Sequence, residues 1–114
     1  VNNDLSALTP EIITKAALKG DRFSIDFWNA VGERIGVTLA GIVNLLNPER
    51  IIIGGGVAGA GELIFRSIRK TVDVRALPIP GKAVKILKAK LGNDAGIIGA
   101  AALFFYPGTA GRCK

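Results

Sequence analysis

Apolar residues recur at steps of three and four over a long stretch in the first half of the chain. The apolar positions from Asp21 onward are Ile25, Trp28, Val31, Ile35, Leu39, Ile42 and Leu46. This spacing places them on one side of an amphipathic helix, with Asp21 as its N-cap and Pro48 beyond its end. A ridge of small residues runs along the same stretch: Gly32, Gly36, Ala40 and Gly41. Because small side chains let another backbone come close, the ridge predicts tight packing against a neighbour.

Shorter elements are predicted on both sides of this helix. Thr9-Pro10-Glu11 is typical of a helix start, and the helix runs to Lys19. The β-branched run Arg50-Ile51-Ile52-Ile53 predicts a strand buried on both faces, as parallel strands are. Residues 84–89 predict a second strand with one wetter face. Helices are expected over 62–72 and 95–105, the latter capped by Asn93-Asp94, and a loop over 77–81.

This order of elements indicates an α/β fold in which two strands pair in parallel through a crossover helix. Two strands make a marginal sheet on their own. The composition agrees with an incomplete core: 49% of the 114 residues are apolar and 21% charged, with a mean hydropathy of +0.39. The chain also begins at Val1 without an initiator Met. We therefore expect an inner part of a larger protein.

Several kinds of chemistry are excluded by the residue types. Without histidine, neither a Ser-His-Asp triad nor a His-containing zinc site can form. The single Cys113 gives no disulfide framework or CxxC motif, which suggests a cytoplasmic protein. No apolar stretch reaches the roughly 18 to 20 residues that span a bilayer, so no membrane partner is expected. We expect no metal ligands and no catalytic residue in this chain.

The formal charge of +6 raises the possibility of a nucleic-acid partner. Basic residues cluster in the second half of the chain, with Asp73 the only acid among them: Arg66, Arg69, Lys70, Arg75, Lys82, Lys85, Lys88 and Lys90. No aromatic residue is interleaved for base stacking, and no DNA-binding module is recognisable. A solvated basic face is the favoured interpretation.

A glycine-rich turn is the strongest candidate for a ligand site. Gly54, Gly56 and Gly59 satisfy G-x-G-x-x-G between a predicted strand and a predicted helix. Residues without Cβ let the backbone approach a nucleotide, although the same turn can serve close packing alone. Dinucleotide binding further requires an acid at the end of the second strand, but Asp73 falls at the end of a helix. A small Rossmann-like module is therefore the weaker alternative.

Three blocks of sequence, in order, resemble the ROK family of bacterial sugar kinases and sugar-responsive repressors. The central block is Asn44-Leu45-Leu46-Asn47-Pro48-Glu49-Arg50-Ile51-Ile52-Ile53-Gly54-Gly55-Gly56-Val57, which is similar to the family's adenosine-side motif. Before it, Ala17-Leu18-Lys19-Gly20-Asp21 resembles A-x-x-G-D. After it, the run from Leu91 to Ala101 resembles L-G-x-D-A-G-x-x-G-A-A. The likeness covers about residues 8–103.

The resemblance implies part of an actin-like, hexokinase-type (ribonuclease H-like) ATPase lobe, with about two strands and four helices. Residues 1–106 would form the C-terminal portion of a kinase lobe, and 107–114 a flexible tail. Gly54, Gly55, Gly56 and Val57 would line the adenosine pocket by close contact. ATP and Mg²⁺ are the implied cofactors and a hexose the implied substrate, as in a glucokinase. The remaining lobe or a second copy of the chain would be its partner.

The family's D-x-G-G-T, N-D-A-N, E-x-G-H and Cys-rich zinc segments are not found in these 114 residues. Asn93-Asp94-Ala95 imitates N-D-A-N, but it lies in the closing block, so Asp94 is interpreted as a helix cap. Without a base for the sugar hydroxyl, the chain alone is expected to be inactive. A fragment of a ROK repressor remains the alternative to a kinase.

Overall fold

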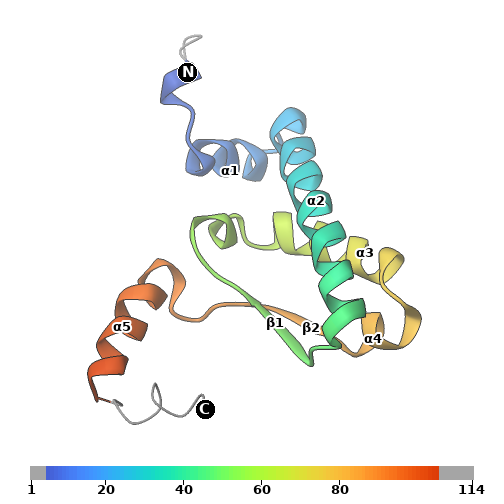
Figure 1. Cartoon of the computed structure of the whole chain (residues 1–114). Helices are drawn as coiled ribbons and strands as arrows, with labels where there is room; N and C mark the ends of the chain where they lie inside the picture. Colours follow the sequence, from blue (N-terminus) through green and yellow to red (C-terminus); the bar gives the residue numbers. More distant parts are fainter. Residues whose placement is uncertain (1–4, 106–114) are drawn as a thin grey trace.

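The computed structural model describes residues 5–105 of the chain (Figure 1). In chain order the elements are η1 (Leu5–Ala7), α1 (Pro10–Leu18), α2 (Arg22–Leu46), β1 (Arg50–Ile53), η2 (Gly56–Ala60), α3 (Glu62–Arg75), α4 (Pro78–Ala83), β2 (Lys85–Lys88), η3 (Gly92–Asp94) and α5 (Ala95–Phe105). Helices α2 and α3 lie together over one face of a two-stranded parallel sheet, and α5 projects away from the other elements.

The predicted starts of the first two helices are confirmed. The Thr9 hydroxyl accepts a hydrogen bond from the Ile12 N–H at 3.4 Å, and Pro10 occupies the first turn of α1. The Asp21 carboxylate accepts hydrogen bonds from the backbone N–H of Ser24, at 2.9 Å, and from its hydroxyl. These acceptors satisfy N–H groups that have no partner inside a helix.

Helix α2 packs against α3 through part of the predicted small-residue ridge. Gly32 and Gly36 are buried against the residues of α3, and Ala40 is 3% exposed. Gly41 was wrongly included in this ridge: a Cβ added there would have no atom within 4 Å. Gly41 is also exposed, unlike the buried Gly32, Gly36 and Ala40.

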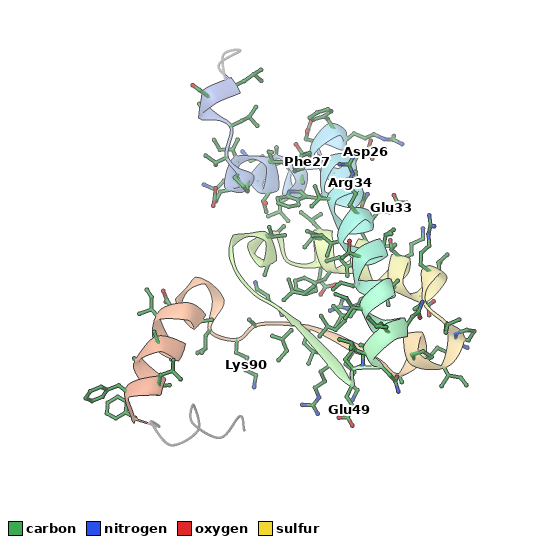
Figure 2. All side chains as sticks on the ribbon, viewed as in Figure 1. Asp26, Phe27, Glu33, Arg34, Glu49 and Lys90 are labelled. Atoms are coloured by element: carbon green, nitrogen blue, oxygen red, sulfur yellow. The ribbon has the colours of Figure 1, made fainter. Side chains whose placement is uncertain are left out.

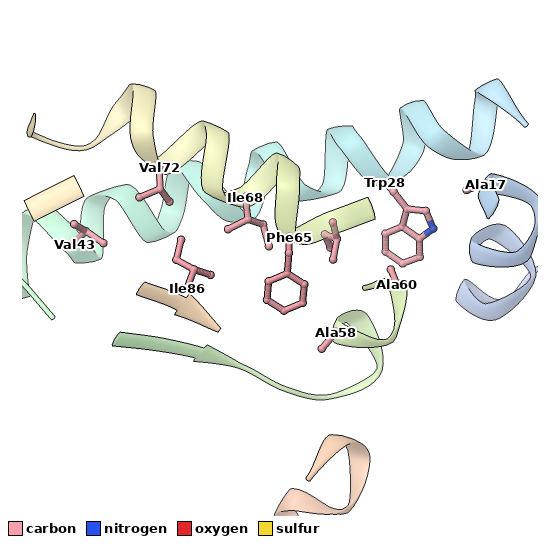
Figure 3. Packing of buried hydrophobic residues seen from close by; sticks show 10 residues of the cluster. Ala17, Trp28, Val43, Ala58, Ala60, Phe65, Ile68, Val72 and Ile86 are labelled. Atoms are coloured by element: carbon pink, nitrogen blue, oxygen red, sulfur yellow. The ribbon is translucent and has the colours of Figure 1, made fainter. Parts of the chain in front are cut away.

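The core lies between these two helices and the sheet (Figure 3). Its fully buried side chains come mostly from α3 and are Phe65, Ile64, Ile68 and Val72, with Val43 from α2. Ile86 of β2 closes the core from the sheet side, and Trp28 extends it toward Ala17 and Ala60. Burial of each large apolar side chain stabilises the fold by about 1.5–3 kcal/mol.

The sheet pairs Ile51 with Ile86 and Ile52 with Leu87. On β2, Ile86 is buried whereas Lys85 and Leu87 are exposed, so the predicted wetter face is confirmed. The prediction that β1 is buried on both faces was wrong for this chain, because Ile52 is 65% exposed. Within residues 5–105, helices cover only the face that carries Ile51 and Ile86, and the opposite face is open.

The segment predicted as a loop over 77–81 is instead the start of α4. Pro78 and Pro80 both fall in its first turn, where the helix requires no N–H donor, so neither proline interrupts it. The Leu77 N–H donates to Asn44 Oδ1 at 2.8 Å and fixes α4 to α2. This helix raises the number of α-helices in the described residues from the expected four to five.

The molecule is more extended than a compact chain of its length. Its radius of gyration is 17.2 Å, compared with about 13 Å for a compact domain of about 100 residues. No residue of α5 is buried, and Phe104 and Phe105 are 82% and 74% exposed. The predicted tail over 107–114, with Cys113, lies outside the described residues.

Candidate functional site

The glycine-rich turn lies where both strands of the sheet end. β1 ends at Ile53 and runs directly into Gly54, and β2, which is parallel to it, ends at Lys88. The carboxyl ends of parallel strands meet at one edge of a sheet, and ligands of open α/β sheets bind outside that edge. The turn therefore occupies the place where such a fold receives a ligand.

A groove of about 410 Å³ opens between this turn and α1. Its walls come from α1, from the turn and η2, and from the residues at and after the end of β2: Pro10, Glu11, Thr14, Lys15, Gly55, Gly56, Ala58, Gly59, Ala60, Lys88 and Gly92. Three separate parts of the chain thus converge on one hollow.

The structure places two of the four predicted adenosine residues in this groove. A Cβ built on Gly55 or on Gly56 meets no atom within 4 Å, so the space in front of both is open to a ligand. Gly55 has a φ of +79° and a ψ of −173°, a conformation that requires glycine. Gly54 lies close to the end of β2, since its Cβ would be 3.3 Å from Ala89 Cβ, and it does not line the groove. Val57 is 41% exposed and lies outside the groove lining.

The charged groups of the groove were not found from the sequence. A backbone hydrogen bond at Glu11 and the Thr9 hydroxyl lower the pKa of the Glu11 carboxyl, and Lys15 adds to the effect. Glu11 therefore carries a negative charge at neutral pH. Lys15 and Lys88 line the same groove with ammonium groups. The helix-start motif indicated that α1 exists, but only the tertiary packing shows which face of α1 lies toward the turn.

A larger hollow of about 980 Å³ adjoins the groove and shares Thr14, Gly59 and Ala60 with it. It runs along the seam between α2 and α3, and its charged lining residues are Glu33, Glu62, Arg66 and Lys70. This hollow lies along the helical layer and lacks Gly55, Gly56 and Lys88 at the strand ends. The smaller groove is therefore the better candidate for a nucleotide.

The described residues do not provide a metal centre. Among residues 5–105, no three histidine, cysteine, aspartate or glutamate side chains lie close enough to hold a metal ion together. Glu11 is the one carboxylate of the groove. Mg²⁺ is commonly bound by one or two carboxylates together with substrate phosphates and water, so the single carboxylate of the groove could hold Mg²⁺ only together with the phosphates of a nucleotide. Over the same residues, no helix has the length and apolar content for crossing a membrane.

Comparison with known proteins defines the class of this fold. A ROK family glucokinase from Streptomyces griseus, solved in complex with glucose and AMPPNP, superposes with a TM-score of 0.72 at 35% identity. The match covers 80% of this chain and 30% of that protein. The chain thus has part of the actin-like ATPase fold. It belongs to the ROK family, whose family model matches residues 1–106.

Both kinases and repressors are among its relatives. The glucokinase of Halalkalibacterium halodurans is 37% identical over 92 residues, which cover 81% of this chain and 28% of that protein. The DNA-binding transcriptional repressor Mlc of Escherichia coli is 33% identical over 94 residues, which cover 82% of this chain and 23% of the repressor. The chain spans about a quarter of the length of these curated relatives.

Proposed function

We propose that this chain is the adenosine-side part of an ATP-dependent sugar kinase of the glucokinase type. The observation that carries the proposal is the position of Gly55 and Gly56, which lack Cβ atoms and face an open groove at the carboxyl ends of both parallel strands. Gly55 and Gly56 would contact the adenosine directly, and Gly54 and Val57 on either side of them would complete this part of the site, with backbone and van der Waals contacts in place of charged ones.

In this proposal, ATP donates its γ-phosphoryl group to a hydroxyl of a hexose. Phosphoryl transfer depends on positioning and charge stabilisation, and the groove residues of this chain contribute the positioning of the adenosine end. Mg²⁺ would neutralise charge on the phosphates; among the described residues, no group of three or more His, Cys, Asp or Glu side chains could hold it without those phosphates. The base that accepts the proton of the sugar hydroxyl is also not found in these 114 residues, so we expect no turnover from them alone.

The open apolar surfaces suggest where the rest of such a kinase packs. Ile52 on the uncovered sheet face and Ile97, Phe104 and Phe105 on α5 are all strongly exposed. Large exposed apolar patches mark interaction surfaces. Residues 1–106 would therefore be an incomplete lobe, covered by further polypeptide of the same protein or by a second copy.

A sugar-responsive repressor is the second candidate function. The observation in its favour is the 33% identity to Mlc over 94 residues, close in length to the 92 residues of the glucokinase match. The strand, the glycine-rich turn and α3 are shared by both kinds of relative, so these elements do not discriminate between them.

Calorimetric titration of this chain with AMPPNP and, separately, with NAD⁺ tests the nucleotide site. We expect heat of binding from AMPPNP only; binding of NAD⁺ instead would support a dinucleotide module. The protein encoded by the complete gene is then assayed for ATP-dependent phosphorylation of a panel of hexoses. Turnover identifies a kinase and its sugar, whereas no turnover together with sequence-specific DNA binding would identify a repressor and overturn the kinase proposal.

A further inference from the structure

The outer edge of β2 carries backbone groups that β1 does not use. The Lys85 N–H donates to the Glu49 carbonyl at 3.0 Å, and the Ala89 N–H to the Ile53 carbonyl at 2.9 Å. Alternate residues of a parallel strand face the same neighbour. The N–H and C=O groups of Ile86 and Lys88 therefore point away from β1, toward an edge that no other strand of residues 5–105 covers.

Two contacts limit this edge. At its start the Val84 N–H donates to the Pro80 carbonyl at 3.1 Å, so α4 closes that end. Further along, Arg69 Nη2 donates to the Ile86 carbonyl at 3.4 Å. Within the part of the chain that the structure describes, the N–H groups of Ile86 and Lys88 have no acceptor, and these two donors lie two residues apart on the same edge.

A groove of about 610 Å³ follows the same edge, between β2, α3 and α4. Its charged lining residues are four cations and one acid: Arg69, Lys70, Lys82, Lys85 and Asp73. Apart from Arg69, which pairs with Glu62 at 3.0 Å, none of these cations has an ion-pair partner among residues 5–105. The groove thus combines unpaired strand donors with an excess of positive charge.

We propose that this edge binds an extended acidic peptide segment of a partner protein, which adds to the sheet as a strand beside β2. Main-chain hydrogen bonds to an exposed edge give affinity in this mode of recognition, and alternate side chains give specificity. In an incoming strand of alternating acidic and apolar residues, the acidic side chains would lie on the exposed face beside Lys85, and the apolar side chains would lie on the opposite face beside Ile86.

Two other occupants, a second copy of the chain and a nucleic acid, fit this groove less well. A second copy of the chain would bring its own Lys85 and Lys88 to this edge, and like charges on paired strands destabilise the pairing. A nucleic acid would satisfy the charges, but the groove lining contains no aromatic side chain on which a base could stack. The acidic peptide satisfies both the backbone donors and the cations.

The test uses a blocked, fluorescent hexapeptide of alternating Glu and Val, titrated into the complete 114-residue chain and followed by anisotropy. The same peptide methylated on every backbone nitrogen keeps its charge but cannot pair as a strand, and we expect it to bind at least about tenfold more weakly. The amide resonances of Ile86 and Lys88 should shift with the unmethylated peptide. Equal binding of the methylated peptide would overturn the proposal without any protein variant.

Charge reversal provides the second comparison. Lys85→Glu should weaken binding of the Glu-Val peptide at least about tenfold and should bind a Lys-Val peptide better than the wild type does. Arg34→Glu is the matched control, because it changes the net charge equally but lies on α2 (Figure 2). Equal effects of the two variants, or tighter binding of a thymidine decanucleotide than of the peptide, would also contradict strand addition.

Discussion

Gly32 of α2 lies so close to Ser67 of α3 that a Cβ on Gly32 would be 2.7 Å from Ser67 Cβ. At the same contact Ser67 Oγ donates a hydrogen bond of 2.8 Å to the carbonyl of Asn29. One turn further along, a Cβ on Gly36 would be 2.6 Å from Thr71 Cβ. The two helices therefore approach closely enough for a side-chain hydroxyl of one to reach the backbone of the other, and they do so only because both positions lack a side chain.

Alanine at either buried glycine is expected to destabilise the chain. Gly36→Ala forces Thr71 or the α3 backbone to move, and overpacking of this kind costs about 1–3 kcal/mol, less the gain of up to about 1 kcal/mol in helix propensity. Gly41→Ala in the same helix has free space around it, so it should be stabilising by about 0.5–1 kcal/mol. Urea unfolding of both variants measures the difference, and equal free energies of unfolding would show that the close approach is unimportant.

Much of this fold could be predicted from local chemistry. Thr9, Asp21 and the ridge at Gly32 and Gly36 each act through residues a few positions away or through the absence of a side chain, and such signals are visible in a sequence. The first turn of α4 was missed because Pro78 and Pro80 are breakers in a helix interior but are tolerated in its first turn. Exposure of Ile52 was missed because coverage of a strand depends on elements far from it in sequence.

The candidate site likewise contains some residues that could be predicted from the sequence and others that could not. Gly55 and Gly56 could be found because a run of glycine after a strand has a specific physical meaning. Glu11, Lys15 and Lys88 could not, since they reach the groove only through the packing of α1 and the parallel register of β2. No spacing rule connects residues of a helix to a strand end more than seventy positions later.

Acid should weaken the N-terminal cap of α2. The hydroxyl and backbone N–H of Ser24 lower the pKa of the Asp21 carboxyl below its ordinary value of 3.8. A carboxyl whose pKa is lower in the folded state than in the unfolded state stabilises the fold fully at a pH above the unfolded-state pKa. This stabilisation is lost as the pH falls through the folded-state pKa. Melting temperatures measured from about pH 6 to about pH 2 should therefore fall more steeply for wild type than for Asp21→Asn, which keeps an acceptor oxygen but does not ionise. Parallel curves would show that Asp21 contributes nothing to the acid response.

Arg69 should matter for more than its ion pair. It donates to Glu62 at 3.0 Å and to the Ile86 carbonyl at 3.4 Å, and its guanidinium lies 5.4 Å from the centre of the Phe65 ring. The pair with Glu62 is exposed, with side-chain exposures of 44% and 78%, so Glu62→Gln should cost less than about 0.5 kcal/mol. Arg69→Ala should cost about 1 kcal/mol more, because it also removes the hydrogen bond to β2 and the cation over Phe65.

A double-mutant cycle at low and high salt separates these contributions. Salt should reduce the Glu62–Arg69 coupling while leaving most of the Arg69→Ala cost intact, because a hydrogen bond to a carbonyl and ring contact are screened less than an exposed ion pair. A cost of Arg69→Ala no larger than that of Glu62→Gln would assign no role to the Ile86 and Phe65 contacts.

Valine at Gly56 should remove nucleotide binding without unfolding the chain. Gly56 lines the groove and has open space at its Cβ position, so a side chain there fills the volume proposed for adenosine and should reduce AMPPNP affinity at least about tenfold. Gly55→Val confuses two effects, since its φ of +79° adds backbone strain of about 1–3 kcal/mol. Gly41→Val, on the distant face of α2, is the control for a substitution in open space. Calorimetric titration measures the AMPPNP affinity of each variant, and urea unfolding of the same preparations shows whether the variant is folded. Unchanged AMPPNP affinity in a folded Gly56→Val chain would place the adenosine site elsewhere.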